Sequence, residues 1–516
     1  MGLYVNLVGD FELTFELSFE ADMSISTFRK LLILSSLLVF LAGSVYAGTG
    51  PDSSSETGEG ESEVESSEAE KPKVTFPAFQ NIRVEEDWGA LKDSDRQTGY
   101  EKLKFIPLNQ SGSVYMSVGG QVRLRGEVWD QFGFGGSGNR DDGFGLMRVR
   151  LHSDLWFGSR FRVFVEGKSS LSTNRDLPGG LRTLDVDTAD IQHLMVDINL
   201  APNPAASTLR LGRQELQFGK QRLVSPLDWA NTRRSWDAAR LIIRQGGWRV
   251  DGFWSEYAAV QKYSLNCADA SGIDFYGIYA TNNIASKKLT LDLYWLGFER
   301  ESASWVGTIG EETRQTFGAR LGGSFSEGKG FFDLEGAFQT GSVGPADVRA
   351  SMFAGQVGAS LQAEGFKPRI YTGLDYGSGD DDPNDNKVGT FNQLFPLGHA
   401  YLGYIDIVGR QNIVDWNAGV SFPLLPKLNF AFDLHNFWRA SAQDAFYNAG
   451  GGVVREGSGG ESKSIGSEVD FTLSSPVNRH LVVTGGYSHF FPGTFIEESG
   501  SAEGINFLYL AVQTTF

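Results

Sequence analysis

Residues 506–516 (NFLYLAVQTTF) alternate between two sets of side chains with a period of two. One set consists of Leu508, Leu510, Val512, Thr514 and Phe516. The other set consists of Phe507, Tyr509, Ala511, Gln513 and Thr515. Successive side chains of a β-strand point to opposite faces, so this alternation predicts a strand with a different solvent on each face.

Residues 23–47 (MSISTFRKLLILSSLLVFLAGSVYA) have the three parts of a secretory signal peptide. Arg29 and Lys30 supply the positive start, an apolar stretch too short to span a bilayer follows, and Val45 and Ala47 are the small residues of the cleavage site. We therefore expect cleavage after Ala47. Residues 1–22 are rich in Asp and Glu, so we interpret them as a start assigned too early, and residues 1–47 as the leader.

The exported chain is predicted to have three parts. Residues 48–73 are mainly Ser, Glu and Gly, which predicts a disordered acidic linker. A solvated spacer is the favoured interpretation of this linker, and an anionic tether in the periplasm is the alternative. Residues 74–113 are interpreted as a periplasmic entrance segment, and residues 114–516 as one barrel.

Composition favours a membrane barrel over a soluble protein. No stretch of about 20 apolar residues follows the leader, and an exported chain without membrane helices is either soluble or a β-barrel. Aromatic residues make up 13% and 64 residues are Gly, as many strands and tight turns require. Only 41% is hydrophobic, which fits a wall whose alternate residues alone meet lipid. The sequence thus predicts an all-β fold, a single transmembrane antiparallel β-barrel, and the strand at 506–516 resembles the closing strand of bacterial outer-membrane barrels.

Arginine is concentrated on one face of the predicted strands in the first half of the barrel. Residues 121–250 carry 19 Lys and Arg against 14 Asp and Glu, and 17 of the 19 are Arg. Residues 251–516 carry 17 against 30. Charges that face lipid near the bilayer midplane cost about 2–4 kcal/mol each, so these arginines are predicted to point into the lumen.

Two interpretations of this arginine-rich wall are of equal weight. In one, the arginines pair with Asp and Glu and only fill and stiffen the barrel. In the other, the surplus positive charge guides anionic solutes, for which the planar, always charged guanidinium is suited. A low-dielectric channel would focus that field and raise the local concentration of anions.

Several motifs, in order along the chain, resemble the bacterial alginate export family of outer-membrane porins. Residues 209–244 contain a Gly-Arg-Gln strand, a Gly-x-x-Arg-Leu turn, an Asp-Trp-x-Asn loop and an Arg-x-x-Asp-x-x-Arg return. Residues 395–412 (FPLGHAYLGYIDIVGRQN) and 486–493 (GYSHFFPG) are also similar to the family. The entrance motifs at 86–88, 104–108 and 117–127, and the one at 466–470, extend the resemblance from about Glu85 to the C-terminus.

The resemblance implies one monomeric barrel of about 18 strands with an electropositive constriction. The positions that match the constriction are Arg123, Arg125, Arg148, Arg150, Arg213, Arg234 and Arg240. Arg213 falls on the face of Leu209 and Leu211 unless Gly212 breaks the alternation. The supporting residues are Arg222, Asp228, Trp229, Asn231 and Asp237. We expect the two aspartates to brace Arg222, Arg234 and Arg240 in an inward-folded loop, as structural and not catalytic groups.

The expected function is an outer-membrane channel that passes uronate-containing poly- or oligosaccharides such as alginate by passive diffusion. The open alternatives are a general or small-anion porin, a barrel with a plugged lumen, and an outer-membrane enzyme. An enzyme is disfavoured because His152 and Ser153 are adjacent on a strand and point to opposite faces. Expected partners are an anionic saccharide or small anion, outer-membrane lipid and periplasmic export proteins, with no nucleic acid. The direction of transport stays open.

Neither a cofactor nor a metal is expected. Residues 377–387 (GSGDDDPNDNK) are rich in oxygen ligands but lack the spacing of an EF-hand, so a surface loop is favoured over a Ca²⁺ site. The six His are scattered, without a pair at metal-binding spacing. Cys267 is the only cysteine, so no intrachain disulfide can form.

Overall fold

The computed structural model describes residues 3–8, 12–17, 76–93, 99–201, 206–284, 288–305, 307–361 and 366–516. The predicted signal peptide at 23–47 and the predicted acidic linker at 48–73 lie outside these residues. The chain divides into two units, and the first comprises Met1–Phe76 and Asp93–Asp95. In it, strand β1 (Leu3–Val8) pairs antiparallel with β2 (Glu12–Leu17). The second unit, Pro77–Lys92 and Arg96–Phe516, contains everything described below.

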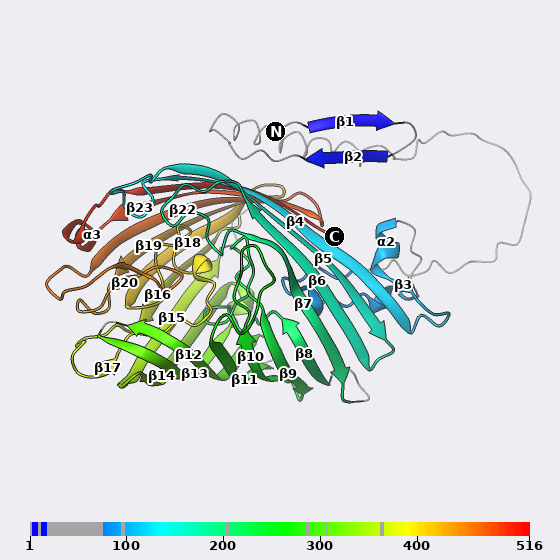
Figure 1. The fold of residues 1–516 in the computed structure, drawn as a ribbon, viewed down its shortest axis with the longest axis horizontal. Coiled ribbons are helices and arrows are strands. Elements are labelled where there is room, and N and C mark those ends of the chain that lie inside the picture. Colours follow the sequence, from blue (N-terminus) through cyan, green and yellow to red (C-terminus); the bar gives the residue numbers. More distant parts are fainter. Residues whose placement is uncertain are drawn as a thin grey trace, which may run out of the picture. The chain divides into compact units, whose positions relative to one another are not determined.

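Eighteen antiparallel strands close into one barrel, which confirms the predicted fold (Figure 1). In the first half, the strands are β4 (Val114–Asp130), β5 (Asp142–Phe157), β6 (Phe161–Ser172), β7 (Asp187–Asn199), β8 (Ser207–Gln214), β9 (Trp236–Gln245), β10 (Trp248–Tyr257), β11 (Ile273–Ile284) and β12 (Leu289–Trp305). In the second half, they are β13 (Thr308–Phe325), β14 (Gly330–Val343), β15 (Ala346–Ser360), β16 (Arg369–Gly377), β18 (Ile413–Leu425), β19 (Leu428–Trp438), β22 (Ser464–Pro476), β23 (Leu481–Pro492) and β24 (Ile505–Thr515). The last strand, β24, pairs with the first, β4, and this pairing closes the wall.

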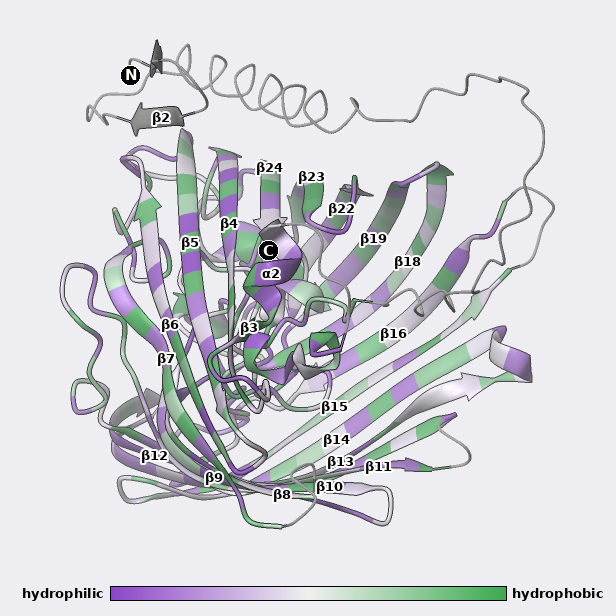
Figure 2. Cartoon of the chain, turned by 90° about the vertical axis from the view of Figure 1, so that its right-hand side faces the viewer, coloured by the Kyte–Doolittle hydropathy of each residue, from purple (hydrophilic) through white to green (hydrophobic). Residues whose placement is uncertain are grey.

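The alternation of side chains along the strands separates lipid from lumen. On β4, Arg123 and Arg125 are each 5% exposed, whereas Leu124 between them is 41% exposed on the outer face. The same pattern recurs around the wall, and Figure 2 shows it as alternating hydrophobic and hydrophilic bands along the strands. Outward side chains that are at least 37% exposed include Leu151, Val165, Leu194, Leu241, Ile278, Leu293, Phe338, Phe353, Trp416 and Phe471. The predicted inward direction of the arginines on β4 and β5 is therefore observed.

The closing strand β24 carries the two faces that its sequence predicts. Leu508 is 50% exposed on the outer face, while Phe507 and Tyr509 are buried on the inner face. Phe507 stacks on Trp129 of β4 with ring centroids 4.2 Å apart. The backbones of Gly120 and Phe516 exchange two hydrogen bonds, of 2.8 and 3.0 Å, at the end of the seam between β24 and β4. Aromatic packing and backbone pairing thus close the barrel at the same place.

Connections at one end of the barrel are short, and most of those at the other end are long, although two residues join β12 to β13 and β14 to β15 there. Short turns at the periplasmic end and long extracellular loops are usual in such barrels. Two long loops, 215–235 between β8 and β9 and 378–412 between β16 and β18, fold back inside the wall (Figures 1 and 2). They meet as neighbouring chain segments, because the Phe395 amide donates to the carbonyl of Leu223 at 2.9 Å and the Ser225 amide donates to the carbonyl of Phe395 at 2.8 Å.

The entrance segment lies against the inner wall at the short-turn end. It contains the 3-10 helices η1 (Arg83–Glu85) and η2 (Gly89–Leu91), the helix α2 (Gly99–Lys104) and the strand β3 (Ile106–Pro107). Arg83 donates hydrogen bonds to the carbonyls of Gly120 and Phe516, at 2.9 and 3.0 Å. Ile82 and Val84 pack against Phe164 and Met195 of the wall. The segment is therefore bound to the barrel by both backbone carbonyls and apolar contacts.

The remaining elements are short. They are η3 (Ser326–Gly328), β17 (Lys387–Val388), η4 (Gly398–Ala400), β20 (Phe446–Tyr447), β21 (Val453–Arg455) and α3 (Thr494–Ser499). In the described part of the chain, no helix combines the length and the apolar character needed to cross a membrane.

A charge on the outer face of β24 tests the assignment of lipid and lumen. We expect Leu508→Arg to lower the free energy of unfolding in lipid vesicles by up to about 2–4 kcal/mol, because the guanidinium would face the hydrocarbon. Thr514→Arg lies on the same face near the strand end, where the cost falls to about 0–1 kcal/mol. Denaturant unfolding of both variants measures the difference. Equal stability of the two variants would contradict the outward assignment of Leu508.

Candidate functional site

The loop of residues 215–235, called the inward loop below, is fixed to the arginines of β4 and β5. Arg123 donates to the backbone carbonyls of Asp228 and Ala230, both at 2.7 Å. Arg148 forms an ion pair of 2.7 Å with the carboxylate of Asp228. Arg125 lies over the ring of Trp229, 4.2 Å from its centroid. The Asp-Trp-x-Asn motif is thus the part of the loop that the arginine wall binds.

Asn231 fastens the same motif to the backbone of the wall. Its side-chain amide nitrogen lies 3.1 Å from the carbonyl of Met147, 3.0 Å from that of Leu171 and 2.9 Å from that of Asp185. Its own carbonyl accepts a hydrogen bond of 2.8 Å from the hydroxyl of Ser170. Asn231 is 1% exposed, so these carbonyls depend on it and not on water.

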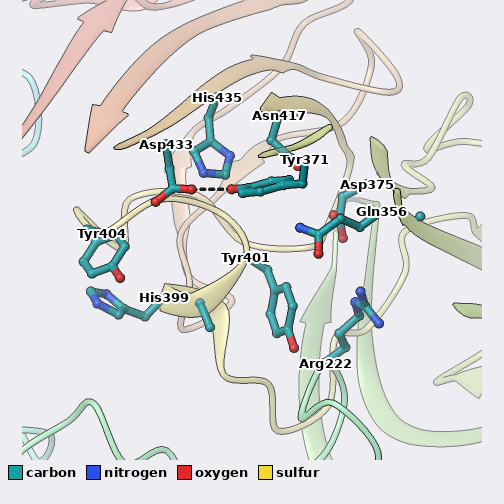
Figure 3. A pocket seen from close by; sticks show the side chains of 12 residues that line it. Arg222, Gln356, Tyr371, Asp375, His399, Tyr401, Tyr404, Asn417, Asp433 and His435 are labelled. Carbon is teal, nitrogen blue, oxygen red and sulfur yellow. Dashed lines mark hydrogen bonds between the residues drawn. The ribbon is translucent and has the colours of Figure 1, made fainter. Parts of the chain in front are cut away.

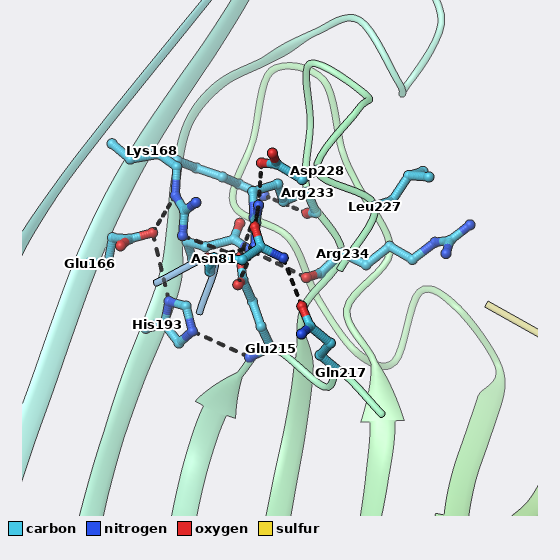
Figure 4. Close-up of polar contacts among 12 residues, drawn as sticks. Asn81, Glu166, Lys168, His193, Glu215, Gln217, Leu227, Asp228, Arg233 and Arg234 are labelled. Carbon is cyan, nitrogen blue, oxygen red and sulfur yellow. Dashed lines mark hydrogen bonds and ion pairs between the residues drawn. The ribbon is translucent and has the colours of Figure 1, made fainter. Parts of the chain in front are cut away.

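A buried network links the inward loop to the entrance segment (Figure 4). Arg233 forms two hydrogen bonds of 2.6 Å with Glu215 and is also paired with Asp228. Arg150 is shared between Glu166, at 2.6 Å, and Glu215, at 3.3 Å. Arg233 also donates to the side-chain oxygen of Asn81 at 3.0 Å. Buried charges of this kind persist only when they are paired, and each charged group of the network has an opposite charge beside it.

Arg213 and Arg240 are paired with acidic residues of the wall. Gly212 has φ +112°, a conformation that favours glycine, but the strand register continues through it and Arg213 stands opposite Leu194 and Asp237. Arg213 binds Asp237 through two hydrogen bonds of 2.8 Å and donates to the carbonyl of Asn266 in a lumenal loop at 3.1 Å. Arg240 pairs with Asp251 at 2.8 Å.

The predicted bracing by Asp228 and Asp237 is wrong in its partners. Asp228 pairs with Arg148 and Arg233, and Asp237 pairs with Arg213. Arg222 pairs with Asp333 and Glu335 of β14 instead. The reason is that the inward loop crosses the lumen, so its charges reach carboxylates of strands that lie far away in the sequence. The loop itself does fold inward.

Arg123 and Arg234 differ from the other predicted arginines. Arg234 donates to the carbonyls of Pro396, at 2.9 Å, and Ser225, at 3.3 Å. Among the residues that the structure describes, no carboxylate oxygen lies within 4.0 Å of either guanidinium. Burial lowers the pKa of Arg234 to about 10, despite an opposing effect of Tyr257, so the group stays charged at neutral pH. These two charges are thus solvated by backbone dipoles and not neutralised by a partner.

Several lumenal charges were not among the predicted site residues. Arg233 and Glu215 lie at the centre of the network in Figure 4, and Arg210 pairs with Asp197 at 2.8 Å. Arg233 and Glu215 lie in a loop, where strand alternation gives no direction for a side chain. A signal for Arg210 was present, because it alternates with Leu209 and Leu211 on β8.

The opposite wall contains a polar pocket of about 80 Å³ (Figure 3). The side chains that line it from the strands include Gln356, Tyr371, Asp375, Asn417, Asp433 and His435. Arg222, His399, Tyr401 and Tyr404 line it from the two lumenal loops. Tyr371 donates a hydrogen bond to Asp433, whereas the side-chain amide of Gln356 has no hydrogen-bond partner in the described part of the chain.

His399 connects this pocket to the inward loop. Its ring stacks on Trp229 with centroids 3.6 Å apart and planes 12° from parallel. The guanidinium of Arg125 covers the ring of Trp229. The arginine wall and the polar pocket are therefore in contact through one aromatic side chain.

The chain matches one protein family and is similar in fold to solved outer-membrane barrels. The family model described as alginate export matches residues 114–508. A search of curated proteins found no match. Crystal structures of Pseudomonas aeruginosa OpdO and of P. aeruginosa OccK2 (OpdF) in complex with glucuronate are similar in fold. OpdO has a TM-score of 0.52 at 14% identity, over 77% of this chain and 97% of that chain. OccK2 has a TM-score of 0.51 at 14% identity, over 77% of this chain and 98% of that chain.

Substitution of Asn231 tests the attachment of the inward loop. We expect Asn231→Ala to lower the free energy of unfolding by about 1–3 kcal/mol, since buried carbonyls lose their donor. Asn231→Asp should destabilise more, because a carboxylate would face the carbonyl oxygens of Met147, Leu171 and Asp185. Denaturant unfolding measures both changes. The idea fails if Asn231→Asp is as stable as the unsubstituted protein.

Proposed function

Because this chain belongs to the alginate export family, we propose that it is an outer-membrane channel that passes uronate-containing poly- or oligosaccharides by passive diffusion through its arginine-rich side. The closed wall has no free strand edge, so a single copy is a complete barrel and we propose that it acts as a monomer. Periplasmic proteins that deliver or receive the saccharide belong to the same proposal.

The positive charges of Arg123 and Arg234 carry this proposal. Each is held by backbone carbonyls, which orient the guanidinium without cancelling its charge. In a lumen surrounded by lipid, such a charge attracts anions over a longer range than an ion pair does. Arg125, Arg148, Arg150, Arg213 and Arg240 pair with carboxylates, so they contribute mainly by fixing the loops.

The polar pocket favours a saccharide over a small inorganic anion. It brings together aromatic rings, planar amides and carboxylates, which suit the CH faces and hydroxyl groups of a pyranose. A uronate chain carries both kinds of chemical group: carboxylates that can bind the arginines and hydroxyls that can bind in the pocket. A barrel of similar fold, OccK2 (OpdF), has been crystallised with glucuronate, a uronate monomer.

The main alternative is a general or small-anion porin. It is favoured by the number of arginines that are already paired, since pairing reduces their capacity to bind a solute. The two functions differ in what the polar pocket does. A small-anion porin makes no use of it, whereas a saccharide channel does.

Ion selectivity in planar bilayers tests the role of the carbonyl-held arginines. We expect anion-selective current in a salt gradient, and a reversal potential that moves towards zero in Arg123→Gln with Arg234→Gln, because two uncompensated charges are removed. Arg234→Lys should keep the selectivity, since it keeps the charge. Arg160→Gln is the matched control, because Arg160 is exposed in the turn before β6. Wild-type current without anion preference would refute the proposal.

Blockade of the current by oligouronates tests the polar pocket. We expect Tyr401→Ala with Gln356→Ala to shorten oligouronate blockades about tenfold, because an aromatic face and an unpartnered amide are lost. The reversal potential for chloride should stay unchanged, since neither side chain is charged. Blockades of equal duration in the variant would favour the small-anion porin.

A further inference from the structure

A second group of arginines surrounds a carboxylate that does not belong to the wall. Arg210 of β8, Arg244 of β9 and Arg249 of β10 face Glu85, which η1 of the entrance segment carries into the lumen. The nearest guanidinium nitrogens lie 3.7, 3.9 and 3.6 Å from the Glu85 oxygens, respectively. Arg244 and Arg249 are directly opposite each other in the β9–β10 hairpin. Arg210, Arg244 and Arg249 are called the arginine triad below.

Glu85 is held loosely in comparison with the other carboxylates of the lumen. Arg210 binds Asp197 with two hydrogen bonds, of 2.8 and 2.9 Å. Its remaining terminal nitrogen Nη1 is buried, makes no hydrogen bond and lies nearest Glu85. All three distances to Glu85 exceed those of a charge-assisted hydrogen bond, and 33% of the Glu85 side chain is exposed. Glu85 is therefore held by charge and not by fitted hydrogen bonds.

Two wall carboxylates, Asp251 and Asp197, pair with the arginines around Glu85. Asp251 accepts hydrogen bonds from both Arg240 and Arg249, at 2.9 Å each. Asp197 is the partner of Arg210. Arg210, Arg240 and Arg249 thus share two wall carboxylates, and Asp197 also lies 3.7 Å from Arg162.

Glu85 remains ionised under all ordinary conditions. Partial burial raises its pKa, but the guanidiniums of Arg210, Arg249, Arg240 and Arg244 outweigh this effect and lower the pKa to about 2. The triad therefore faces a carboxylate anion and not a neutral acid. The Glu85 side chain that occupies the triad is therefore a carboxylate anion, the same group that a uronate unit carries.

We propose that the arginine triad is a carboxylate-binding subsite for uronate units, and that Glu85 occupies it as an internal ligand when no saccharide is present. The identity of the ligand rests on the proposed function. The backbone of η1 holds the Glu85 oxygens 3.6–3.9 Å from the guanidinium nitrogens. A free uronate has no such constraint, so its carboxylate can approach closely enough for bidentate hydrogen bonds. Exchange of one carboxylate for another leaves the charge balance of the lumen unchanged. It frees the Glu85 side chain from the triad, while Arg83 and Val84 keep η1 on the wall.

Binding of glucuronate to the full-length protein in detergent, measured by titration calorimetry, tests the proposal. If Glu85 vacates the triad for about a tenth of the time, the apparent affinity in Glu85→Gln rises about tenfold. Adding Arg249→Gln to Glu85→Gln should lower the affinity for glucuronate about tenfold again, because one charge-assisted hydrogen bond to the ligand is lost. Glucose, which has no carboxylate, should show no such gain.

Asp87→Asn is the matched control, since Asp87 is an exposed carboxylate on the same segment. It should leave the affinity for glucuronate unchanged, and thermal unfolding should confirm that all variants fold. Equal affinity in the wild type and in Glu85→Gln, or an equal gain in Asp87→Asn, overturns the proposal. The bilayer assay separates this result from the channel function. A gain in Glu85→Gln without any current supports the subsite and sinks the channel, whereas selective current without the gain does the reverse.

Discussion

The structure depends on the requirement that a charge inside the barrel meets either an opposite charge or a row of backbone carbonyls. A guanidinium that faces lipid is costly, so the arginines of β4 and β5 turn inward. Once inside, Arg148 finds Asp228, Arg240 finds Asp251 and Arg123 finds the carbonyls of the inward loop. The inward loop brings the partners of Arg123 and Arg148, whereas Asp251 lies on β10. The arginine wall and the folded loops are thus two results of the same electrostatic demand.

The interior is divided into two walls of different chemistry. The first strands present arginines, whose charges are partly left without carboxylate partners. The later strands present tyrosines, amides and aspartates around the polar pocket. Trp229 and His399 stack at the border between the two. The net charge of the whole chain, −18, says little about either wall.

Sequence reasoning succeeded where the period of the strand decides the outcome. The faces of Arg123, Leu124 and Arg125 follow from alternation alone, and so does the closing strand. It failed for the partners of charges, because Arg222 meets Asp333 only after a loop crosses the lumen. Arg233, at the centre of the buried network, lies in a loop without periodicity. The inward folding of that loop was expected from family motifs and not from any local pattern of its residues.

The seam between β24 and β4 has a consequence for the order of assembly. Arg83 binds two carbonyls together, those of Gly120 on β4 and Phe516 beyond β24. These two carbonyl oxygens become neighbours only when β24 has paired with β4. The pair of carbonyls that binds Arg83 is therefore absent until β24 pairs with β4, whereas the apolar contacts of Ile82 and Val84 on β6 and β7 do not need closure. Arg83 of the entrance segment therefore reaches its final place in the lumen after the barrel has closed.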